Sequence, residues 1–103
     1  MRTKLIKYEN SRITVTGKVD KINKKAKTIC IQNITSASGE LLTDHIWLKE
    51  SDIKLGRQYL SKNNIIEFSG LITTYYKKSG MDYCFINVSI RRKKSNDYNN
   101  KWF

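Results

Sequence analysis

Hydrophobic and polar residues alternate most clearly along two segments near the end of the chain, Ile65–Tyr76 and Tyr83–Arg91. In the first, one face carries Ile66, Phe68, Gly70 and Ile72, and the other carries Glu67, Ser69, Thr73 and Tyr75. In the second, one face carries Cys84, Ile86, Val88 and Ile90, and the other carries Tyr83, Phe85, Asn87, Ser89 and Arg91. A period of two is typical of a strand with one buried face. Lys77–Asp82 joins the segments with basic and turn-forming residues, so we predict a long hairpin with a cationic tip.

Three earlier segments also alternate: Arg12–Ile22, Thr28–Ile34 and Leu42–Leu48. The first is rich in β-branched residues, which favour strands. It places Ile13, Val15 and Val19 on one face together with Gly17, where a bend or bulge is expected. In the second, we expect Ile29 and Ile31 to face the core and Cys30 and Gln32 to face outward.

The remaining segments are less regular. Residues 1–11 predict an N-terminal arm or a short extra strand, and residues 95–103 a flexible tail that ends in Trp102-Phe103. Lys49–Lys62 lacks a period of two and predicts a short helix, capped by Ser51 or Asp52, or an irregular connector. Residues 12–94 then form one all-β domain of five antiparallel strands. Closing these strands into a small barrel would remove exposed strand edges.

Composition supports a single small domain, with 103 residues of which 39% are hydrophobic. No apolar run reaches the roughly 18 residues of a membrane span, and residues 1–7 lack the apolar stretch of a signal peptide. We therefore expect a cytoplasmic protein. Its two cysteines, Cys30 and Cys84, should be reduced, and with one histidine in the chain they predict neither a structural zinc site nor another cofactor.

Charge is the most informative bulk property, because 20 basic and 9 acidic residues give a net charge of +11. Residues 1–30 carry a net +7, residues 31–62 a net 0 and residues 63–103 a net +4. Such an excess favours a polyanionic partner, since lysines and arginines that neutralise phosphates release counterions. A fold that brings the two basic regions together would form one cationic patch.

The order of these elements resembles the OB-fold over residues 12–92. The matching features are Gly17 in the first strand, the connector after the third strand, and a turn before Ile66-x-Phe68-x-Gly70. The stretch Leu41–Leu48 is similar to segments of small OB-like proteins from phages and mobile elements. The resemblance implies that nucleic acid would cross the outer face of strands two and three, between the first-to-second and fourth-to-fifth strand loops. Those loops are Lys21–Lys27 and Tyr75–Tyr83 here.

Both of these loops are basic, which makes them candidates for contacting phosphates. The cationic candidates are Lys21, Lys24, Lys25, Lys27, Lys77 and Lys78, and the run Arg91-Arg92 would extend the track. Gln32 and His45 are candidates on the outer face. Single strands also need aromatic platforms, where a stacked base contributes about 1–3 kcal/mol. The candidate platforms are Trp47, Tyr75, Tyr76, Tyr83 and Phe85.

The exposure of these rings depends on strand register. If Ile46 and Leu48 fill the core, Trp47 and His45 face outward, and the opposite register buries Trp47. Adjacent Tyr75 and Tyr76 have opposite parity, so one of them should face solvent in either register. At least one of Tyr83 and Phe85 is expected outside, unless a helix or the N-terminal arm covers both.

No catalytic arrangement is evident in the sequence: it shows no Ser/Cys–His constellation, no paired carboxylates at an obvious cleft and no phosphate-binding glycine-rich loop. We therefore predict a non-enzymatic protein that binds single-stranded nucleic acid with little sequence preference, DNA being favoured over RNA. The alternative is an OB-like adaptor that binds a replication or recombination enzyme through exposed hairpin aromatics and Trp102-Phe103.

Overall fold

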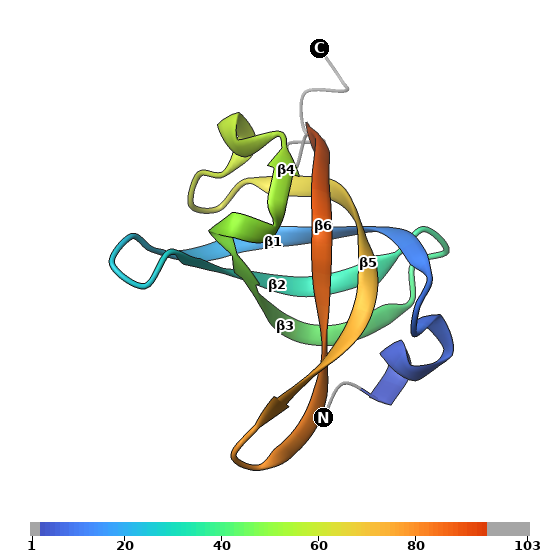
Figure 1. Cartoon of the computed structure of the whole chain (residues 1–103). Coiled ribbons are helices and arrows are strands. Elements are labelled where there is room, and N and C mark those ends of the chain that lie inside the picture. Colours follow the sequence, from blue (N-terminus) through green and yellow to red (C-terminus); the bar gives the residue numbers. More distant parts are fainter. Residues whose placement is uncertain (1–2, 95–103) are drawn as a thin grey trace.

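The structure is a computed structural model that describes residues 3–94, so the predicted tail at 95–103, with Trp102-Phe103, lies outside the described residues (Figure 1). Strands make up most of it: β1 (Arg12–Asn23), β2 (Thr28–Ser36), β3 (Leu41–Lys49), β4 (Ile53–Leu55), β5 (Ile65–Lys77) and β6 (Gly80–Lys94). Three short 3-10 helices complete it: η1 (Thr3–Tyr8), η2 (Glu50–Asp52) and η3 (Arg57–Tyr59). The predicted all-β class is confirmed. No helix of the described part is long and apolar enough to cross a membrane.

All six strands belong to one sheet in the order β3-β2-β1-β5-β6-β4. Neighbours are antiparallel except for β4 and β6, which are parallel. Because β3 and β4 are its two edge strands, the sheet is not closed as a barrel by strand pairing, and the prediction of five strands is wrong by one. The additional strand lies within the connector that was expected to be helical or irregular.

A short part of the connector, Ile53–Leu55, forms a strand because Ile53 packs against β6. Ile53 is fully buried and pairs with Val88. Gly56, with φ 89°, then ends the pairing at a point where a Cβ atom would collide with the carbonyl oxygen of Ile90. A glycine is therefore required there by both the left-handed backbone and the close approach.

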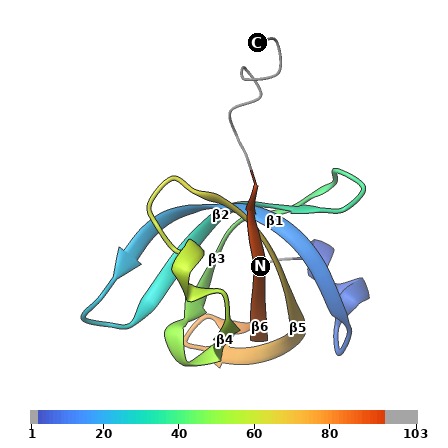
Figure 2. The ribbon, with the colours of Figure 1, turned by 90° about the horizontal axis from the view of Figure 1, so that it is seen from above.

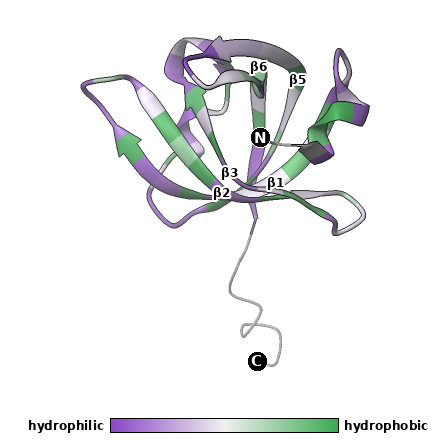
Figure 3. Ribbon diagram, turned by 90° about the horizontal axis from the view of Figure 1, so that it is seen from below, coloured by the Kyte–Doolittle hydropathy of each residue, from purple (hydrophilic) through white to green (hydrophobic). Residues whose placement is uncertain are grey.

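The sheet is strongly curved, so its two edges come near each other although they are not paired (Figures 1 and 2). β1, β2 and β3 form one side, and the long β5–β6 hairpin crosses the other. The three residues of η2 join the edge strands β3 and β4 directly. Hydrophobic and hydrophilic residues alternate along β1, β2 and β3 (Figure 3). The buried apolar residues form the core.

The predicted inward faces of β1, β2 and β5 are confirmed. The buried residues include Val15, Val19, Ile29, Ile31, Ile66, Phe68 and Ile72. The irregularity expected near Gly17 is also present, because the pairing of β1 and β2 shifts between Thr16 and Lys18. The extra residue lies on β2, where Asn33 has φ 57° and Ile34 after it returns to the core. A Cβ on Gly17 would meet the Ile31 side chain at 2.5 Å, so the glycine makes room for this packing.

The predicted faces of β6 are wrong in its first half. Tyr83 and Phe85 are buried at 5% and 1% exposure, whereas Cys84 and Ile86 are only half-buried. The cause is a β-bulge at Asn87, which has φ 50° and lies between the paired positions Ile86–Leu71 and Ser89–Ser69. One extra residue reverses the side-chain parity. Odd-numbered residues therefore face the core before the bulge and even-numbered residues face it afterwards. Val88 and Ile90, which follow the bulge, are buried as predicted.

The N-terminal arm is neither extended nor a strand. Residues Thr3–Tyr8 form η1, whose Leu5 is fully buried in the core. The backbone N–H of Asn10 donates to the carbonyl oxygen of Ile72 at 2.8 Å, which attaches the arm to β5. The arm therefore covers the end of the core from which the β5–β6 hairpin projects.

Candidate nucleic-acid interface

Trp47 lies on the outer face of β3, so the first of its two possible registers is present. Ile46 and Leu48 on either side of it are fully buried, and the indole ring is 43% exposed. Cross-strand pairing aligns Trp47 with Cys30 of β2, and Cys30 with Lys21 of β1. Cys30 also points outward but is buried at 5% exposure. An aromatic ring, a thiol and a lysine therefore form one row across three strands.

A second row lies beside the first on the same outer face. Register pairs His45 with Gln32, Gln32 with Lys18 and Lys18 with Ile65. The two rows border a shallow hollow of about 510 Å³. Its lining consists of Asp20, Lys21, Cys30, Gln32, Asn33, Asp44, His45 and Trp47. The predicted outer-face residues Gln32, His45 and Trp47 thus border the same surface.

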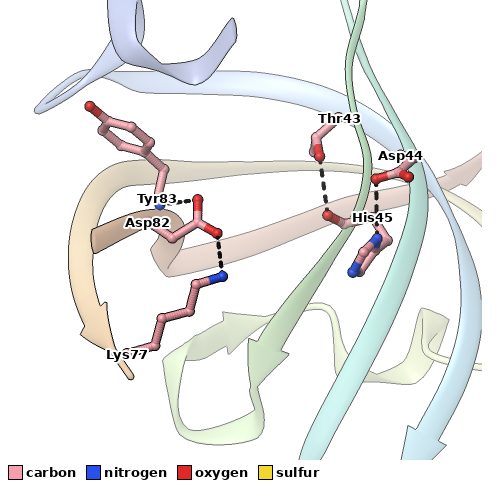
Figure 4. Close-up of polar contacts among 6 residues, drawn as sticks. All are labelled: Thr43, Asp44, His45, Lys77, Asp82 and Tyr83. Carbon is pink, nitrogen blue, oxygen red and sulfur yellow. Dashed lines mark hydrogen bonds and ion pairs between the residues drawn. The ribbon is translucent and has the colours of Figure 1, made fainter. Parts of the chain in front are cut away.

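His45 is hydrogen-bonded within its own strand. Its Nδ1 lies 3.1 Å from Oδ1 of Asp44, and its carbonyl oxygen accepts from the Thr43 hydroxyl at 3.3 Å (Figure 4). Both the His45 and Asp44 side chains are exposed. Two carboxylates, Asp44 and Asp20, therefore lie in a hollow whose neighbourhood is basic. Carboxylates repel phosphates but accept hydrogen bonds from base amino groups.

The β1–β2 turn presents its lysines to solvent. The side-chain oxygen of Asn23 accepts the N–H of Ala26 at 2.9 Å, and Lys27 has φ 57°, so the turn is tight and locally hydrogen-bonded. Lys24, Lys25 and Lys27 are exposed. A further hollow of about 620 Å³ lies at the base of this turn. Its lining is Asp20, Lys21, Ile22, Asn23, Lys24, Trp47 and Lys62.

Lys62 and Lys18 are two basic residues that the sequence did not single out. Lys62 precedes β5 in an irregular segment, and the backbone of Asn63 beside it bonds to Val19 at 2.7 Å, which places it against the β1–β2 turn. Lys18 alternates with core residues of β1 and so faces outward between Gln32 and Ile65. The period of two in β1 could have identified Lys18, whereas nothing local to Lys62 indicated its neighbours.

The β5–β6 turn is also basic, but one of its lysines is engaged inside the protein. Lys77 Nζ lies 2.9 Å from Oδ2 of Asp82, a carboxylate on a residue only 2% exposed (Figure 4). The other oxygen of Asp82 accepts the backbone N–H of Tyr83 at 2.8 Å. Lys78 is exposed at the tip. Of the two lysines at the hairpin tip, Lys77 therefore forms an ion pair with Asp82, and Lys78 is exposed to solvent.

The predicted hairpin rings separate into two groups. Tyr75 and Tyr76 are exposed at 36% and 84%. Tyr83 and Phe85 are core residues, and the expectation that at least one is exposed is wrong because the bulge at Asn87 turns both inward. Phe85 packs edge-to-face on Phe68 with ring centroids 5.4 Å apart. Neither of these two buried rings can stack on a base.

Tyr83 is linked to the N-terminal arm through its hydroxyl, which donates to Oε1 of Glu9 at 3.4 Å. Burial raises the pKa of this phenol above its ordinary value, and the negative charge of Glu9 adds to the effect. Tyr83 is therefore a neutral structural residue at physiological pH.

Arg91 and Arg92 lie at the far end of β6 from the hairpin tip. Both form ion pairs with Glu67 of β5, at 3.8 and 3.1 Å. Glu67 pairs across the sheet with Thr16 of β1, one outward-facing position from Lys18. The structure therefore places the two arginines beyond the second row, away from Trp47 and the hairpin rings.

The Trp47 side chain borders several of the hollows in this region. It borders the outer-face hollow, the hollow under the β1–β2 turn and a third hollow beside the β5–β6 hairpin that also contacts Tyr75. In Figure 1 the β1–β2 turn projects to the left and the hairpin tip downward, so the two turns occupy adjacent corners of the molecule. We refer to the surface formed by Lys21, Gln32, His45 and Trp47 as the Trp47 face.

Comparison of the chain with protein-family models, with curated proteins and with solved structures gave no match. Within residues 3–94, no three or more His, Cys, Asp or Glu side chains cluster as they would to hold a metal ion. The functional argument therefore rests on the geometry and charge of the Trp47 face.

Proposed function

We propose that this protein binds single-stranded nucleic acid, without enzymatic activity, on the Trp47 face. The observation that carries the proposal is the position of the Trp47 ring, which is 43% exposed, lies beside the basic β1–β2 turn and borders three hollows. Stacking on such a ring is tolerant of sequence, because every base has a π-face. Lys21, Lys24 and Lys62 lie where they can neutralise the phosphates of a strand stacked there.

The strand order supports an OB-type relationship as part of this proposal. If β3 and β4 are counted as one strand interrupted by η2, the chain has five strands and its sheet is a partly open barrel. OB-folds are partly open five-stranded barrels that bind oligonucleotides across strands two and three and the loops beside them. Most of the Trp47 face lies on β2 and β3, beside the β1–β2 turn.

Titration of a labelled oligodeoxythymidine of about 12 nucleotides tests the proposal, because small barrels bind roughly 4–16 nucleotides. We expect affinity to fall steeply with salt, with a slope of log affinity against log salt of about −0.7 per neutralised phosphate. Trp47→Ala should weaken binding by about 1–3 kcal/mol at every salt concentration. No binding of the wild-type protein at low salt would refute the proposal.

Matched variants separate the basic turn from total charge. Lys24→Ala and Lys4→Ala each remove one positive charge from an exposed side chain. Lys24 and Trp47 border the same hollow under the β1–β2 turn, whereas Lys4 lies on η1 and donates to the carbonyl oxygen of Leu41 at the opposite end of β3. We expect only Lys24→Ala to reduce the salt slope by about 0.7. Equal effects of both would indicate a response to net charge alone.

The adaptor alternative is favoured by a different surface. Leu55 of the edge strand β4 is 65% exposed, and an exposed apolar residue on a strand edge is typical of a protein contact. Binding of a protein partner through this surface would show little salt dependence and would be abolished by Leu55→Glu but not by Trp47→Ala.

Competition between matched DNA and RNA oligonucleotides on the wild-type protein decides which nucleic acid is preferred.

A further inference from the structure

The edge strand β3 and the first half of β6, which β4 leaves unpaired, border a hollow of about 410 Å³, which we call the seam. On one side is the end of β3, and on the other are β5 and the first half of β6. Its lining consists of Thr28, Trp47, Leu48, Lys49, Ser51, Asp52, Thr73, Thr74, Tyr75, Tyr83, Cys84, Phe85 and Ile86. The seam exists because β4 pairs with β6 only around Val88 and Ser89, so β3 and the first half of β6 lie close together without strand pairing between them.

Aromatic and apolar side chains make up much of the lining of the seam, and hydroxyl groups lie among them. Trp47 and Tyr75 both border it and are both partly exposed, so two rings reach its opening. Thr28, Thr73 and Thr74 add hydroxyl groups that can donate or accept hydrogen bonds. Lys49, exposed on β3, adds a positive charge. Aromatic walls, a few polar groups and an adjacent cation suit a flat heteroaromatic ring attached to a phosphate.

We propose that the seam receives one base of the bound strand, turned out of the stack at Trp47. This inference depends on the proposed function, because the strand must first lie on the Trp47 face. A strand that leaves the outer-face hollow passes the Trp47 ring, which borders both hollows, and reaches the seam next. The base then lies beside Trp47 and Tyr75 while its phosphate remains outside near Lys49.

The dimensions of the seam favour a base over an extended peptide. A strand added to the edge of β6 would continue toward Val88, but β4 already occupies that edge. Ser51 and Asp52 of η2 border the same end of the hollow. The seam is therefore a short slot, at the small end of the 300–1,000 Å³ that is usual for ligand sites. A single base fits such a slot, whereas a peptide of several residues needs a groove open at both ends.

An abasic scan tests the proposal on the full chain. The probe is the shortest oligodeoxythymidine that binds with full affinity, so that the strand cannot shift along the site, and it lacks one base at each position in turn. We expect the loss of one particular base to weaken binding about tenfold more than the loss of its neighbours. In Ser51→Trp, which fills the end of the slot, this extra penalty should disappear. Ser61→Trp, at an exposed position outside the seam, should retain it.

Alkylation of Cys84 gives an independent readout. Cys84 borders the seam and is half-buried, whereas Cys30 lies under the outer-face hollow. Peptide mapping measures the reaction at each thiol separately. A saturating complete oligonucleotide should slow the alkylation of Cys84 about tenfold, and the oligonucleotide lacking the seam base should not.

The outcomes separate this inference from the proposed function. Tight, salt-dependent binding with equal abasic penalties and an unchanged rate at Cys84 would overturn the seam site and leave the Trp47 face intact. Protection of Cys84 by an extended peptide but not by the oligonucleotide would also overturn it. Absence of any oligonucleotide binding would reject both.

Discussion

Trp47 is positioned by the residues on either side of it in the sequence. Ile46 and Leu48 are both buried, and since adjacent strand residues point to opposite faces, the ring between them must face outward. Cys30, which pairs with Trp47 across the two strands, is a small residue and is buried. The sequence left two registers open for this strand because Trp47 is itself apolar and would fit inside. The number of buried aliphatic neighbours decides the register.

At the same scale, Tyr83 makes stability fall at high pH. Its pKa is raised in the folded protein by burial and then by Glu9, so the folded state holds the phenol proton more tightly than the unfolded state does. Its contribution is complete below the unfolded-state pKa of about 10 and is lost as pH rises through the folded-state pKa. Between about pH 9 and pH 12, the free energy of unfolding of Tyr83→Phe should therefore decline less than that of the wild type.

The matched control for this measurement is Tyr76→Phe, which alters a ring that is 84% exposed. Denaturant unfolding at each pH gives the slopes. We expect Tyr76→Phe to retain the wild-type decline, and a wild-type decline in Tyr83→Phe would show that Tyr83 does not couple folding to alkaline pH.

Asn87 yields a second residue-scale prediction because of its left-handed backbone, φ 50°. Glycine adopts this conformation without cost, whereas a β-branched residue is strained by about 1–2 kcal/mol. Asn87→Val should therefore destabilise the protein by about that amount and Asn87→Gly should be close to neutral, measured by denaturant unfolding. Equal destabilisation by both variants would mean that the Asn87 side chain, and not its backbone, is what the bulge requires.

At the scale of elements, the alternating pattern predicts a strand reliably but locates its bulges poorly. In β5 the face with Ile66, Phe68 and Ile72 is the more apolar one, and its inward residues are those that the pattern predicted. In β6 both faces are apolar before Asn87, because Tyr83 and Phe85 compete with Cys84 and Ile86. Larger rings release more free energy on burial, so they take the core side and a bulge restores the other parity at Val88.

Asparagine is the local signal that could have revealed these bulges. Asn33 and Asn87 both have positive φ, and each is followed by a buried aliphatic residue, Ile34 or Val88. Asparagine is enriched in left-handed backbone, so an asparagine inside an alternating run indicates a change of face. By contrast, no local feature of Ile53–Leu55 distinguishes a strand from a short helix, since its pairing with β6 depends on residues more than thirty positions away.

The β5–β6 hairpin should show different roles for its two lysines. Lys77→Met removes a partner from the buried Asp82 carboxylate and should lower the free energy of unfolding by about 1–3 kcal/mol. Lys78→Met alters an exposed side chain and should change the free energy of unfolding by less than about 0.5 kcal/mol.

For oligonucleotide binding we expect Lys78→Met, and not Lys77→Met, to reduce the slope of log affinity against log salt by about 0.7. The reverse assignment would show that the tip rearranges on binding.

At the scale of the whole molecule, folding brings basic side chains together near the Trp47 face without pairing most of them with carboxylates. The net charge of +11 remains, and most of the ion pairs lie away from the Trp47 face, as those of Glu67 with Arg91 and Arg92 do. The sequence showed the excess of charge and the two basic turns. It could not show that Lys62 approaches the first turn or that the arginines lie apart, because those positions follow from the sheet order.

A single-stranded ligand should raise the thermal midpoint of such a protein. At a free oligonucleotide concentration of about 100 Kd, linkage stabilises the folded state by about 2.7 kcal/mol. For a domain of this size, that corresponds to a rise of about 10–20 °C in Tm. An uncharged-backbone analogue of the same sequence is the control and should give little rise. An equal rise with both would exclude phosphate contacts as the source of affinity.

The short link η2 has a further consequence, because it ties together the two rims of the same sheet. Three residues, Glu50–Asp52, act as a fixed spacer between these rims, whereas the hairpin turns can lengthen without altering any rim. A chain with a longer spacer would allow the rims to lie farther apart while every strand kept its partners. The width of the opening beside Trp47 is thus specified by the length of one loop and can change independently of the core.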